Sequence, residues 1–390
     1  MPTVKETVAA ISKLLVLSYI IDWIFIVGIA LIGYGFYKQP QNHHPFSLTD
    51  PTISYPLSEE TVTTTTLILV CLFAPAILIL LGSWLLVPAK ATSASTYNPS
   101  STSNPTPKPP AAQSIRRKFW EWNAGWMGLA LALASAWTAT QGLKVLVGKP
   151  RPDMLARCDP DVSRVTEFTV SGLGSSVSGA ATLVSWEICR NQGRMLRIDG
   201  FASFPSGHSS FSFAGLIYLT LWLCSKFSVA FPYLPRYPVE DQRHIDDSTS
   251  VRKRGAAPPV YLMLIAFVPT ATASFIAASR WFNYRHHGFD ILFGSALGVF
   301  FAYIAFNMYH LPIRRGAGWA WGARSRKRAF VRGVGFPSSL GNDGWAGEWA
   351  LDGDVEGAGV RDMVVRGQGA QGQGRIKPEG SEGEAVRLEG

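Results

Sequence analysis

Long apolar runs alternate with polar connections along this chain as far as Tyr309. Six runs approach the roughly 20 residues that a helix needs to cross the hydrocarbon core of a bilayer. They are Leu14–Tyr37, Val62–Val87, Trp122–Leu143, Phe211–Cys224, Pro259–Ala278 and Ile291–Tyr309. The fourth run is short by strict apolarity, and its helix is expected to begin already at Ser206. The pattern therefore predicts an all-α fold, an integral membrane bundle of six transmembrane helices.

Two polar stretches do not have the composition of a folded unit. Ala91–Ala112 is rich in Ser, Thr, Pro and Asn, and from about Ala329 to Gly390 glycine recurs every few residues among mixed charges. Neither stretch has enough apolar surface to offset the entropy lost on ordering. We expect an N-terminal segment at 1–13, a six-helix domain at 14–310 with a disordered linker at 91–112, and a disordered tail at 329–390.

The charge distribution predicts how the chain crosses the membrane. Of its 390 residues 47% are hydrophobic and 16% charged, and the formal net charge is +9. Cations gather between the second and third runs, between the fourth and fifth, and after the sixth, whereas the first connection holds Lys38 alone. Cytoplasmic connections carry such an excess of Lys and Arg. The long connection between the third and fourth runs carries six arginines and departs from the rule, as long loops often do. Both termini are therefore expected in the cytosol, and no pattern of interleaved basic and aromatic residues predicts a nucleic-acid partner.

The four cysteines divide by position. Cys71 and Cys224 lie within apolar runs, where cysteine usually serves as a small packing residue. Cys158 and Cys189 share the long connection between the third and fourth runs, on the side expected to be lumenal or extracellular. An oxidising compartment permits a disulfide between them. The alternative is two free thiols in a flexible loop.

A histidine and an acid precede the sixth run. If the helix begins near His286, a spacing of four places His286 and Asp290 on one face. The carboxylate would then accept the imidazole N–H and leave the other ring nitrogen free to act as a nucleophile. His287 has Ile291 at the same spacing, so His286 is the better candidate. The alternative is an interfacial histidine beside an incidental acid.

A serine-rich sequence leads into the fourth run. Ser206 is suited to be a helix N-cap, and Gly207 allows close approach of the backbone to a ligand. The N-terminus of a helix is a ready anion-binding site. His208 lies one or two positions inside, where it could donate a proton to a leaving oxygen. The alternative, an ordinary Ser-rich helix start, explains the cap and not the histidine.

Three cations stand at the ends of runs on this same face. Lys144 closes the third run, Arg151 is fixed in an extended bend by Pro150 and Pro152, and Arg280 closes the fifth. A guanidinium can hold two phosphate oxygens at once. Lys144 could instead satisfy helix-terminal carbonyls, and Arg280 could be a snorkelling anchor.

The three clusters in this order resemble the signature motifs of the type 2 phosphatidic acid phosphatase superfamily. The motifs are Lys-x6-Arg-Pro, Pro-Ser-Gly-His and Ser-Arg-x5-His-x3-Asp, and every signature position is present. The resemblance runs from about Leu14 to Tyr309. Within the superfamily the chain looks most like the eukaryotic lipid phosphate phosphatases, and the segment from Tyr55 to Glu60 is similar to fungal diacylglycerol pyrophosphate phosphatases.

The resemblance implies a role for each motif residue. His286 would attack phosphorus and form a phosphohistidine, Asp290 would position it, and His208 would protonate the leaving group. The phosphate oxygens would be held by Lys144, Arg151, Ser206, Gly207 and Arg280. The family needs no cofactor, and the sequence lacks the acidic ligand cluster of a magnesium site. The hydrolysis would therefore be metal-independent.

The expected partners are the lipid bilayer and a membrane phospholipid phosphate such as phosphatidate, diacylglycerol pyrophosphate or lysophosphatidate. A homo-oligomer is compatible with the pattern. The active site would face the lumen or the exterior, in an endomembrane, vacuolar or plasma membrane. Two alternatives stay open: a phosphatase for polyisoprenyl or sphingoid-base phosphates, and a catalytically inactive lipid-binding scaffold.

Overall fold

The computed structural model describes residues 13–87, 111–174, 176–230, 257–313, 318–324 and 330. The segment before residue 13 lies outside the described residues. So do nearly all of the linker and tail that were expected to be disordered. The last two residues of the expected linker, Ala111 and Ala112, already belong to a helix.

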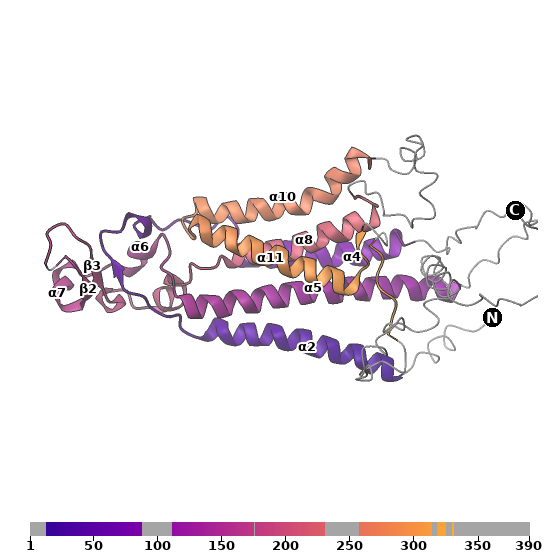
Figure 1. Cartoon of the computed structure of the whole chain (residues 1–390), viewed down its shortest axis with the longest axis horizontal. Helices are drawn as coiled ribbons and strands as arrows, with labels where there is room; N and C mark the ends of the chain where they lie inside the picture. Colours follow the sequence, from indigo (N-terminus) through magenta and orange to yellow (C-terminus); the bar gives the residue numbers. More distant parts are fainter. Residues whose placement is uncertain are drawn as a thin grey trace, which may run out of the picture.

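Long helices run side by side and make up most of the described chain (Figure 1). They are α2 (Lys13–Lys38), a continuous segment from Thr64 to Leu85, α5 (Ala111–Val147), α8 (Gly207–Lys226), α10 (Val260–Phe282) and α11 (Gly288–Tyr309). The segment Thr64–Leu85 consists of α3 (Thr64–Ile68), the π-helical η2 (Leu69–Phe73) and α4 (Ala74–Leu85). Each predicted run thus corresponds to a helix.

Five of these helices are long and apolar enough to cross a membrane, and α8 is not among them. α8 is 20 residues long but carries several hydroxyl side chains. It packs against α5, α10 and α11, and Ser209, Ser210 and Ser212 are buried there. Since α8 faces protein on these sides, it does not need the apolar surface that lipid requires of its neighbours. This explains why the fourth run was the shortest in the sequence.

Small residues let α11 and α8 approach closely at the end of the bundle where the polar clusters lie. A Cβ at Gly294 would lie 2.6 Å from the main-chain oxygen of Ser206, and a Cβ at Gly298 would lie 2.5 Å from that of Ser210. A larger residue at either position would push the two helices apart. The starts of α8 and α11 are thereby held next to each other.

A small cap covers this end of the bundle (Figure 1). It contains an antiparallel three-stranded sheet in the order β1-β3-β2, formed by β1 (Phe46–Ser47), β2 (Thr169–Gly172) and β3 (Thr182–Val184). Short helical segments complete it: η1 (Pro51–Ile53), α6 (Met154–Cys158), η3 (Val162–Arg164), α7 (Val165–Phe168), η4 (Trp186–Ile188) and η5 (Met195–Gly200). The all-α prediction omitted this sheet because its strands have only two to four residues, too few for a clear alternating pattern.

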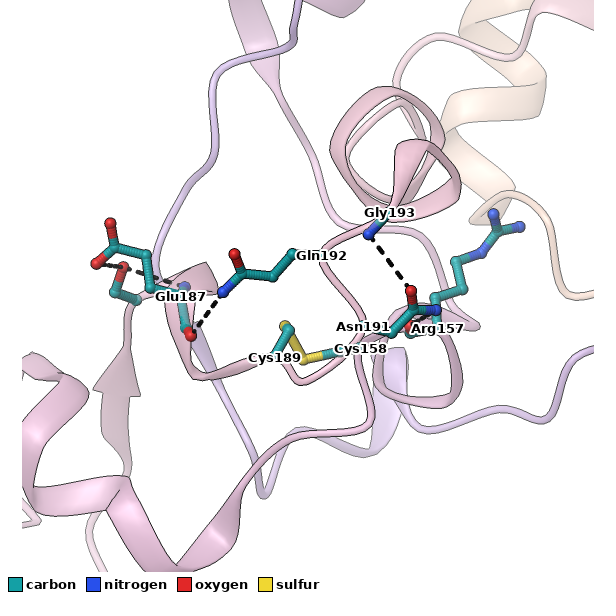
Figure 2. Close-up of a disulfide and its surroundings, with 8 residues drawn as sticks. Arg157, Cys158, Glu187, Cys189, Asn191, Gln192 and Gly193 are labelled. Carbon is teal, nitrogen blue, oxygen red and sulfur yellow. Dashed lines mark hydrogen bonds between the residues drawn. A yellow bond between two sulfur atoms is a disulfide. The ribbon is translucent and has the colours of Figure 1, made fainter.

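Cys158 and Cys189 form a disulfide within the cap (Figure 2). The bond links the end of α6 to the residue after η4, and both cysteines are buried. Main-chain hydrogen bonds from Asp161 to Ile188 and from Asn191 to Cys158 hold the same two segments together. Cys71 and Cys224 are free and buried, as expected of packing residues.

Replacing Cys158 and Cys189 together by serine is expected to destabilise the cap by about 2–5 kcal/mol, the usual cost of losing a native disulfide. The bond closes a sequence separation of 31 residues, so its loss frees a long loop in the unfolded cap. The measurement is thermal unfolding of the purified protein in detergent, with and without reductant. Reductant should lower the transition temperature of the wild type and leave that of the double variant unchanged; equal shifts in both would contradict the prediction.

Candidate active site

The three sequence clusters meet where α5 and α10 end and where α8 and α11 begin, beneath the cap. Lys144 lies in the last turn of α5, Ser206 caps α8, and Arg280 lies in the last turn of α10. A Cβ at Gly207 would lie 3.5 Å from Lys144 Nζ, so the first and second clusters are in direct contact. The structure therefore brings together residues that are up to 146 positions apart, from Lys144 to Asp290.

His286 lies between α10 and α11 and is only 3% exposed. Its Nδ1 is 2.6 Å from the main-chain oxygen of Ser203. Because a carbonyl oxygen can only accept, this contact places the ring proton on Nδ1 and leaves the lone pair on Nε2. Nε2 in turn lies 3.5 Å from Nη1 of Arg151. The ring is thus held in the tautomer that a nucleophile requires, with its free nitrogen facing a cation.

The expected pairing of His286 with Asp290 is wrong. α11 begins at Gly288, with His287 as its N-cap, so His286 precedes the helix and does not share a helical face with Asp290. The carboxylate of Asp290 instead accepts from the main-chain N–H of His287 at 3.2 Å and lies 3.2 Å from the same residue's Nδ1. The comparison that favoured His286, in which His287 had only Ile291 at a spacing of four, did not foresee this contact between His287 and Asp290.

Asp290 acts on His286 only through Ser203. The hydroxyl of Ser203 donates to Asp290 at 2.6 Å, while the carbonyl of the same residue holds His286. Lys149 contacts the other oxygen of Asp290 at 2.8 Å. The donors from His287 and Ser203 therefore fix the start of α11 and the loop that holds His286, and Lys149 ties the same carboxylate to the segment after α5.

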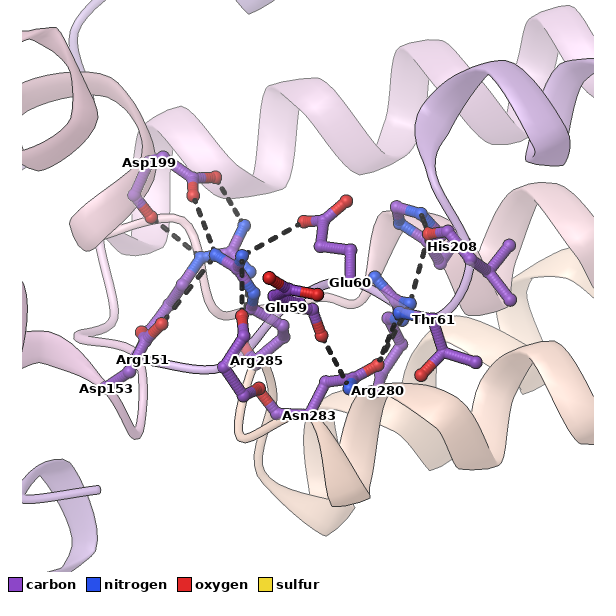
Figure 3. A network of polar contacts seen from close by, with 12 residues as sticks. Glu59, Glu60, Thr61, Arg151, Asp153, Asp199, His208, Arg280, Asn283 and Arg285 are labelled. Carbon is purple, nitrogen blue, oxygen red and sulfur yellow. Dashed lines mark hydrogen bonds and ion pairs between the residues drawn. The ribbon is translucent and has the colours of Figure 1, made fainter. Parts of the chain in front are cut away.

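Arg151 is buried and held on two sides by Asp199 (Figure 3). Its Nη2 donates to Asp199 Oδ1 at 2.6 Å and its Nε donates to the main-chain oxygen of Asp199 at 2.8 Å. Nη1 donates to the main-chain oxygen of Arg285 at 3.1 Å and is the nitrogen that faces His286. Asp199 thus fixes the plane of the guanidinium, and we infer that it is a positioning residue for Arg151.

Asp199 is part of a larger ionic network in the cap (Figure 3). Its second oxygen accepts from Arg157 at 2.7 Å, and Arg157 makes two further 2.8 Å hydrogen bonds to the buried Asp153. Burial would raise the pKa of Asp199, but the charges of Arg151 and Arg157 outweigh it and hold the pKa below its usual value. Asp199 is therefore ionised, and Arg151 at one oxygen and Arg157 at the other balance its charge.

His208 and Arg280 share one acceptor on the other side of the site, the main-chain oxygen of Val62 (Figure 3). His208 Nε2 lies 3.1 Å from this oxygen, and Nη2 of Arg280 donates to it at 3.1 Å. Asn283 also accepts from this guanidinium at 3.4 Å and donates to the main-chain oxygen of Glu59 at 2.9 Å. The polar connection before α3 therefore forms a wall of the site, which sequence reasoning missed.

Ser206 is the N-cap of α8, as predicted from its sequence. Its hydroxyl accepts from the main-chain N–H of Ser209 at 3.4 Å and from the Ser209 hydroxyl at 2.9 Å. The N–H of Ser206 donates to the main-chain oxygen of Asp290 at 3.0 Å. The positive end of the α8 dipole lies beside Lys144, where an anion would be stabilised.

The residues that sequence reasoning missed act mostly through the main chain. Val62 and Ser203 contribute carbonyl oxygens, which any residue type could supply, so no side chain marks them in the sequence. Asp199 and Asn283 have informative side chains but stand outside the three motifs. Across the described ranges, no three His, Cys, Asp or Glu side chains come together as a metal-binding group.

Comparison with known proteins identifies a family for the part of the chain that holds these clusters. Residues 125–314, which hold all three clusters, match the model of the PAP2 superfamily. The chain is 33% identical over 187 residues to diacylglycerol pyrophosphate phosphatase 1 of Saccharomyces cerevisiae, covering 48% of this chain and 52% of that protein. It is 29% identical over 217 residues to lipid phosphate phosphatase 1 of Arabidopsis thaliana, covering 56% and 54%.

A third relative is matched over most of its length. The chain is 30% identical over 269 residues to the probable diacylglycerol pyrophosphate phosphatase 1 of Schizosaccharomyces pombe, covering 69% of this chain and 72% of that protein. For the budding-yeast and plant relatives, the chain spans about half of their length. No solved structure matches. The family match and the extent of the fission-yeast similarity show that this multi-pass membrane protein belongs to the PAP2 superfamily.

Proposed function

We propose that this chain is a lipid phosphate phosphatase that hydrolyses phosphate monoesters or pyrophosphates of membrane lipids through a phosphohistidine, without a metal ion. Phosphatidate, diacylglycerol pyrophosphate and lysophosphatidate are the substrates of first choice. The observation that carries the proposal is the setting of His286, whose Nε2 lone pair faces Arg151 while Ser203 holds its other nitrogen. The names of the fungal and plant relatives agree with this activity.

The reaction has two steps. Nε2 of His286 attacks phosphorus, the bond to the leaving oxygen breaks, and its electron pair remains on that oxygen. Water then attacks the phosphohistidine, the P–N bond breaks, and orthophosphate and the free imidazole are released. Lys144, Arg151 and Arg280 stabilise the charge on the non-bridging oxygens in both steps, together with the start of α8.

His208 is suited to supply the proton to the leaving oxygen. Because its Nε2 lies against the carbonyl of Val62, that nitrogen carries a proton in the neutral ring. In its imidazolium form, the ring would give this proton to a leaving oxygen that takes the place of the carbonyl, and would be left neutral. In the second step the ring can accept a proton back from the attacking water, which restores the starting state.

The active site is proposed to lie on the lumenal or extracellular face. Supporting this, the disulfide lies in the cap at the site's end of the bundle, and disulfides persist in oxidising compartments. Arg116, Arg117 and Lys118 lie at the start of α5, and Lys226 lies at the end of α8, both at the opposite end of the bundle. Such an excess of cations is typical of cytoplasmic boundaries.

The test is phosphate release by the purified full-length chain in detergent, in the presence of EDTA. The panel contains phosphatidate, diacylglycerol pyrophosphate, lysophosphatidate, a sphingoid-base phosphate and a polyisoprenyl phosphate. Release from one of the first three is the expected result. A preference for the sphingoid-base phosphate or the polyisoprenyl phosphate would show that the proposed substrate class is wrong. No release from any lipid would indicate a binding protein, and activity that EDTA abolishes and magnesium restores would refute the metal-free mechanism.

The activity is expected to persist at pH values below 6.5. Burial, and then the charges of Arg151 and Lys144, lower the pKa of His286 well below its ordinary value of 6.5. Acidification to about pH 6 would therefore leave the nucleophile unprotonated. The measurement is kcat/KM against pH, with the ionisation of the substrate phosphate followed separately by ³¹P NMR and divided out. An acidic limb at or above pH 6.5 after this correction would contradict the prediction.

A further inference from the structure

A cavity of about 430 Å³ opens beside the phosphate-binding cations. Tyr37, in the last turn of α2, and Gln41 line one side, Gln141 and Lys144 of α5 line another, and Arg194 and Asp199 close it from the η5 segment. Its size is within the range of sites that hold a small ligand. Lys144 lines this cavity and also lies against Gly207, so the cavity and the candidate active site share this residue.

Two buried amides face this cavity. Gln41 and Gln141 are each only 5% exposed, although glutamine is ordinarily found at the surface. Within the described part of the chain, Oε1 of Gln41 has no hydrogen-bond partner. A buried polar atom without a partner is destabilising, and a polar ligand in the cavity would remove that cost. Because Oε1 and phosphate oxygens are both acceptors, the amide of Gln41 must turn by 180°, which exchanges Oε1 and Nε2, to donate to a phosphate.

The charges around the cavity favour an anion. Lys144 and Arg194 contribute two cations, and Arg194 pairs with no carboxylate among the residues that the structure describes. Asp199 is the one acid in the lining, and Arg151 and Arg157 already neutralise it at 2.6 Å and 2.7 Å. Phosphate groups are the anions that Arg and Lys bind best, and amide N–H groups complete such sites.

We propose that this cavity is a subsite for a second phosphate of the substrate, the one that stays with the lipid when a lipid pyrophosphate is cleaved. This inference rests on the proposed function. The terminal phosphoryl group would be transferred to Nε2 of His286, and the bond to the bridging oxygen would break with its electron pair on that oxygen. The lipid monophosphate would leave from the cavity, and water would release orthophosphate from the histidine. Since two phosphates of a pyrophosphate share one oxygen, their subsites must be contiguous, and Lys144, which borders both places, is positioned to contact the two phosphates.

The cavity also provides selectivity between lipid pyrophosphates and lipid monophosphates. A monophosphate would occupy only the site at His286, and would leave Arg194 and Gln41 without a ligand. A pyrophosphate would satisfy both groups, and each charged hydrogen bond gained would strengthen its binding by about tenfold or more. Arg194 and Gln41 are accordingly specificity-determining residues.

The test measures binding directly, so that it does not depend on turnover. Calorimetry compares methylenediphosphonate, which has two phosphonate groups and no cleavable bridge, with methylphosphonate, on the full-length chain in detergent. The wild type is expected to bind the bisphosphonate at least about tenfold more tightly. Arg194→Gln and Gln41→Leu should each lose most of that advantage. Arg194 is exposed, so its replacement should leave folding intact.

Arg197→Gln is the matched control. Arg197 lies on η5 three residues further along, is exposed, stacks over the ring of Trp186 and does not line the cavity. Its replacement removes the same charge from the same segment and should leave the advantage of the bisphosphonate unchanged. Equal affinities for both probes in the wild type would overturn the proposal. So would an advantage that survives Arg194→Gln, or one that Arg197→Gln reduces as much.

Turnover on the same samples separates this inference from the proposed function. The ratio of kcat/KM for diacylglycerol pyrophosphate to that for phosphatidate should fall about tenfold in Arg194→Gln and stay constant in Arg197→Gln. If the wild type releases phosphate from no lipid, the proposed function fails, while the binding measurement still decides about the cavity. If the wild type is active and the ratio is unchanged in Arg194→Gln, only the subsite is refuted.

Discussion

Replacing His286 by alanine is expected to lower phosphate release by about 10⁴–10⁶-fold, the range seen when an enzyme loses its covalent nucleophile. The remaining cations would still bind the lipid, but no other imidazole in the site has its lone pair set toward Arg151. The substitution removes the hydrogen bond to the main-chain oxygen of Ser203 and the 3.5 Å contact with Nη1 of Arg151, and the protein should remain folded. The measurements are single-turnover phosphate release and thermal unfolding of the same preparation.

His287→Ala is the matched control, because it removes the adjacent imidazole. His287 Nδ1 is occupied by Asp290 at 3.2 Å and Ser203 Oγ at 3.3 Å, and the residue caps α11. Its loss should reduce activity far less, through a looser start of α11. Trapping of ³²P on the wild type and His287→Ala, but not on His286→Ala, would identify the nucleophile. A loss of labelling in His287→Ala that leaves His286→Ala labelled would reverse the assignment.

His208→Ala is expected to slow the hydrolysis of phosphatidate by about 10²–10⁴-fold, the usual contribution of a general acid. The leaving group is then an alkoxide that departs without a proton. The loss should be much smaller for an aryl phosphate such as p-nitrophenyl phosphate, because its leaving oxygen needs little protonation. Steady-state rates on both substrates test this difference.

His44→Ala serves as the control for this variant, since His44 is an exposed histidine of the cap. It should leave both rates unchanged. A His208→Ala variant that loses the same factor on both substrates would show that the imidazole binds phosphate and does not donate the proton. The function of His208 would then be to form, together with Arg280, the wall of the site at the main-chain oxygen of Val62.

The helices could be predicted from the sequence because a bilayer imposes a simple rule on the helices that cross it. A helix that contacts lipid must be apolar over its whole length, and α2, α10 and α11 show this pattern plainly. α8 follows the rule poorly because it packs against α5, α10 and α11. Its start was therefore predicted from the N-cap residue Ser206 and not from hydropathy. The cap sheet has no such rule, since its short strands are fixed by the packing of Phe46 and Val184 in the cap core.

The side chains of the site could also be predicted from the sequence. Phosphate chemistry needs cations and imidazoles, and such residues are rare at the ends of apolar runs. The sequence alone therefore determined which residues gather: Lys144, Arg151, His208, Arg280 and His286. It also led to a wrong partner for His286, since a start of α11 only two residues later removes the helical register with Asp290.

Only the tertiary structure decided how these residues are held. The carbonyls of Ser203 and Val62 set the two histidine tautomers, and Asp199 sets the plane of Arg151. The cavity at Gln41 likewise exists only because α2, α5 and η5 meet. A sequence displays the kind of each side chain, whereas the direction of a main-chain carbonyl and the space between helices arise from packing between distant segments.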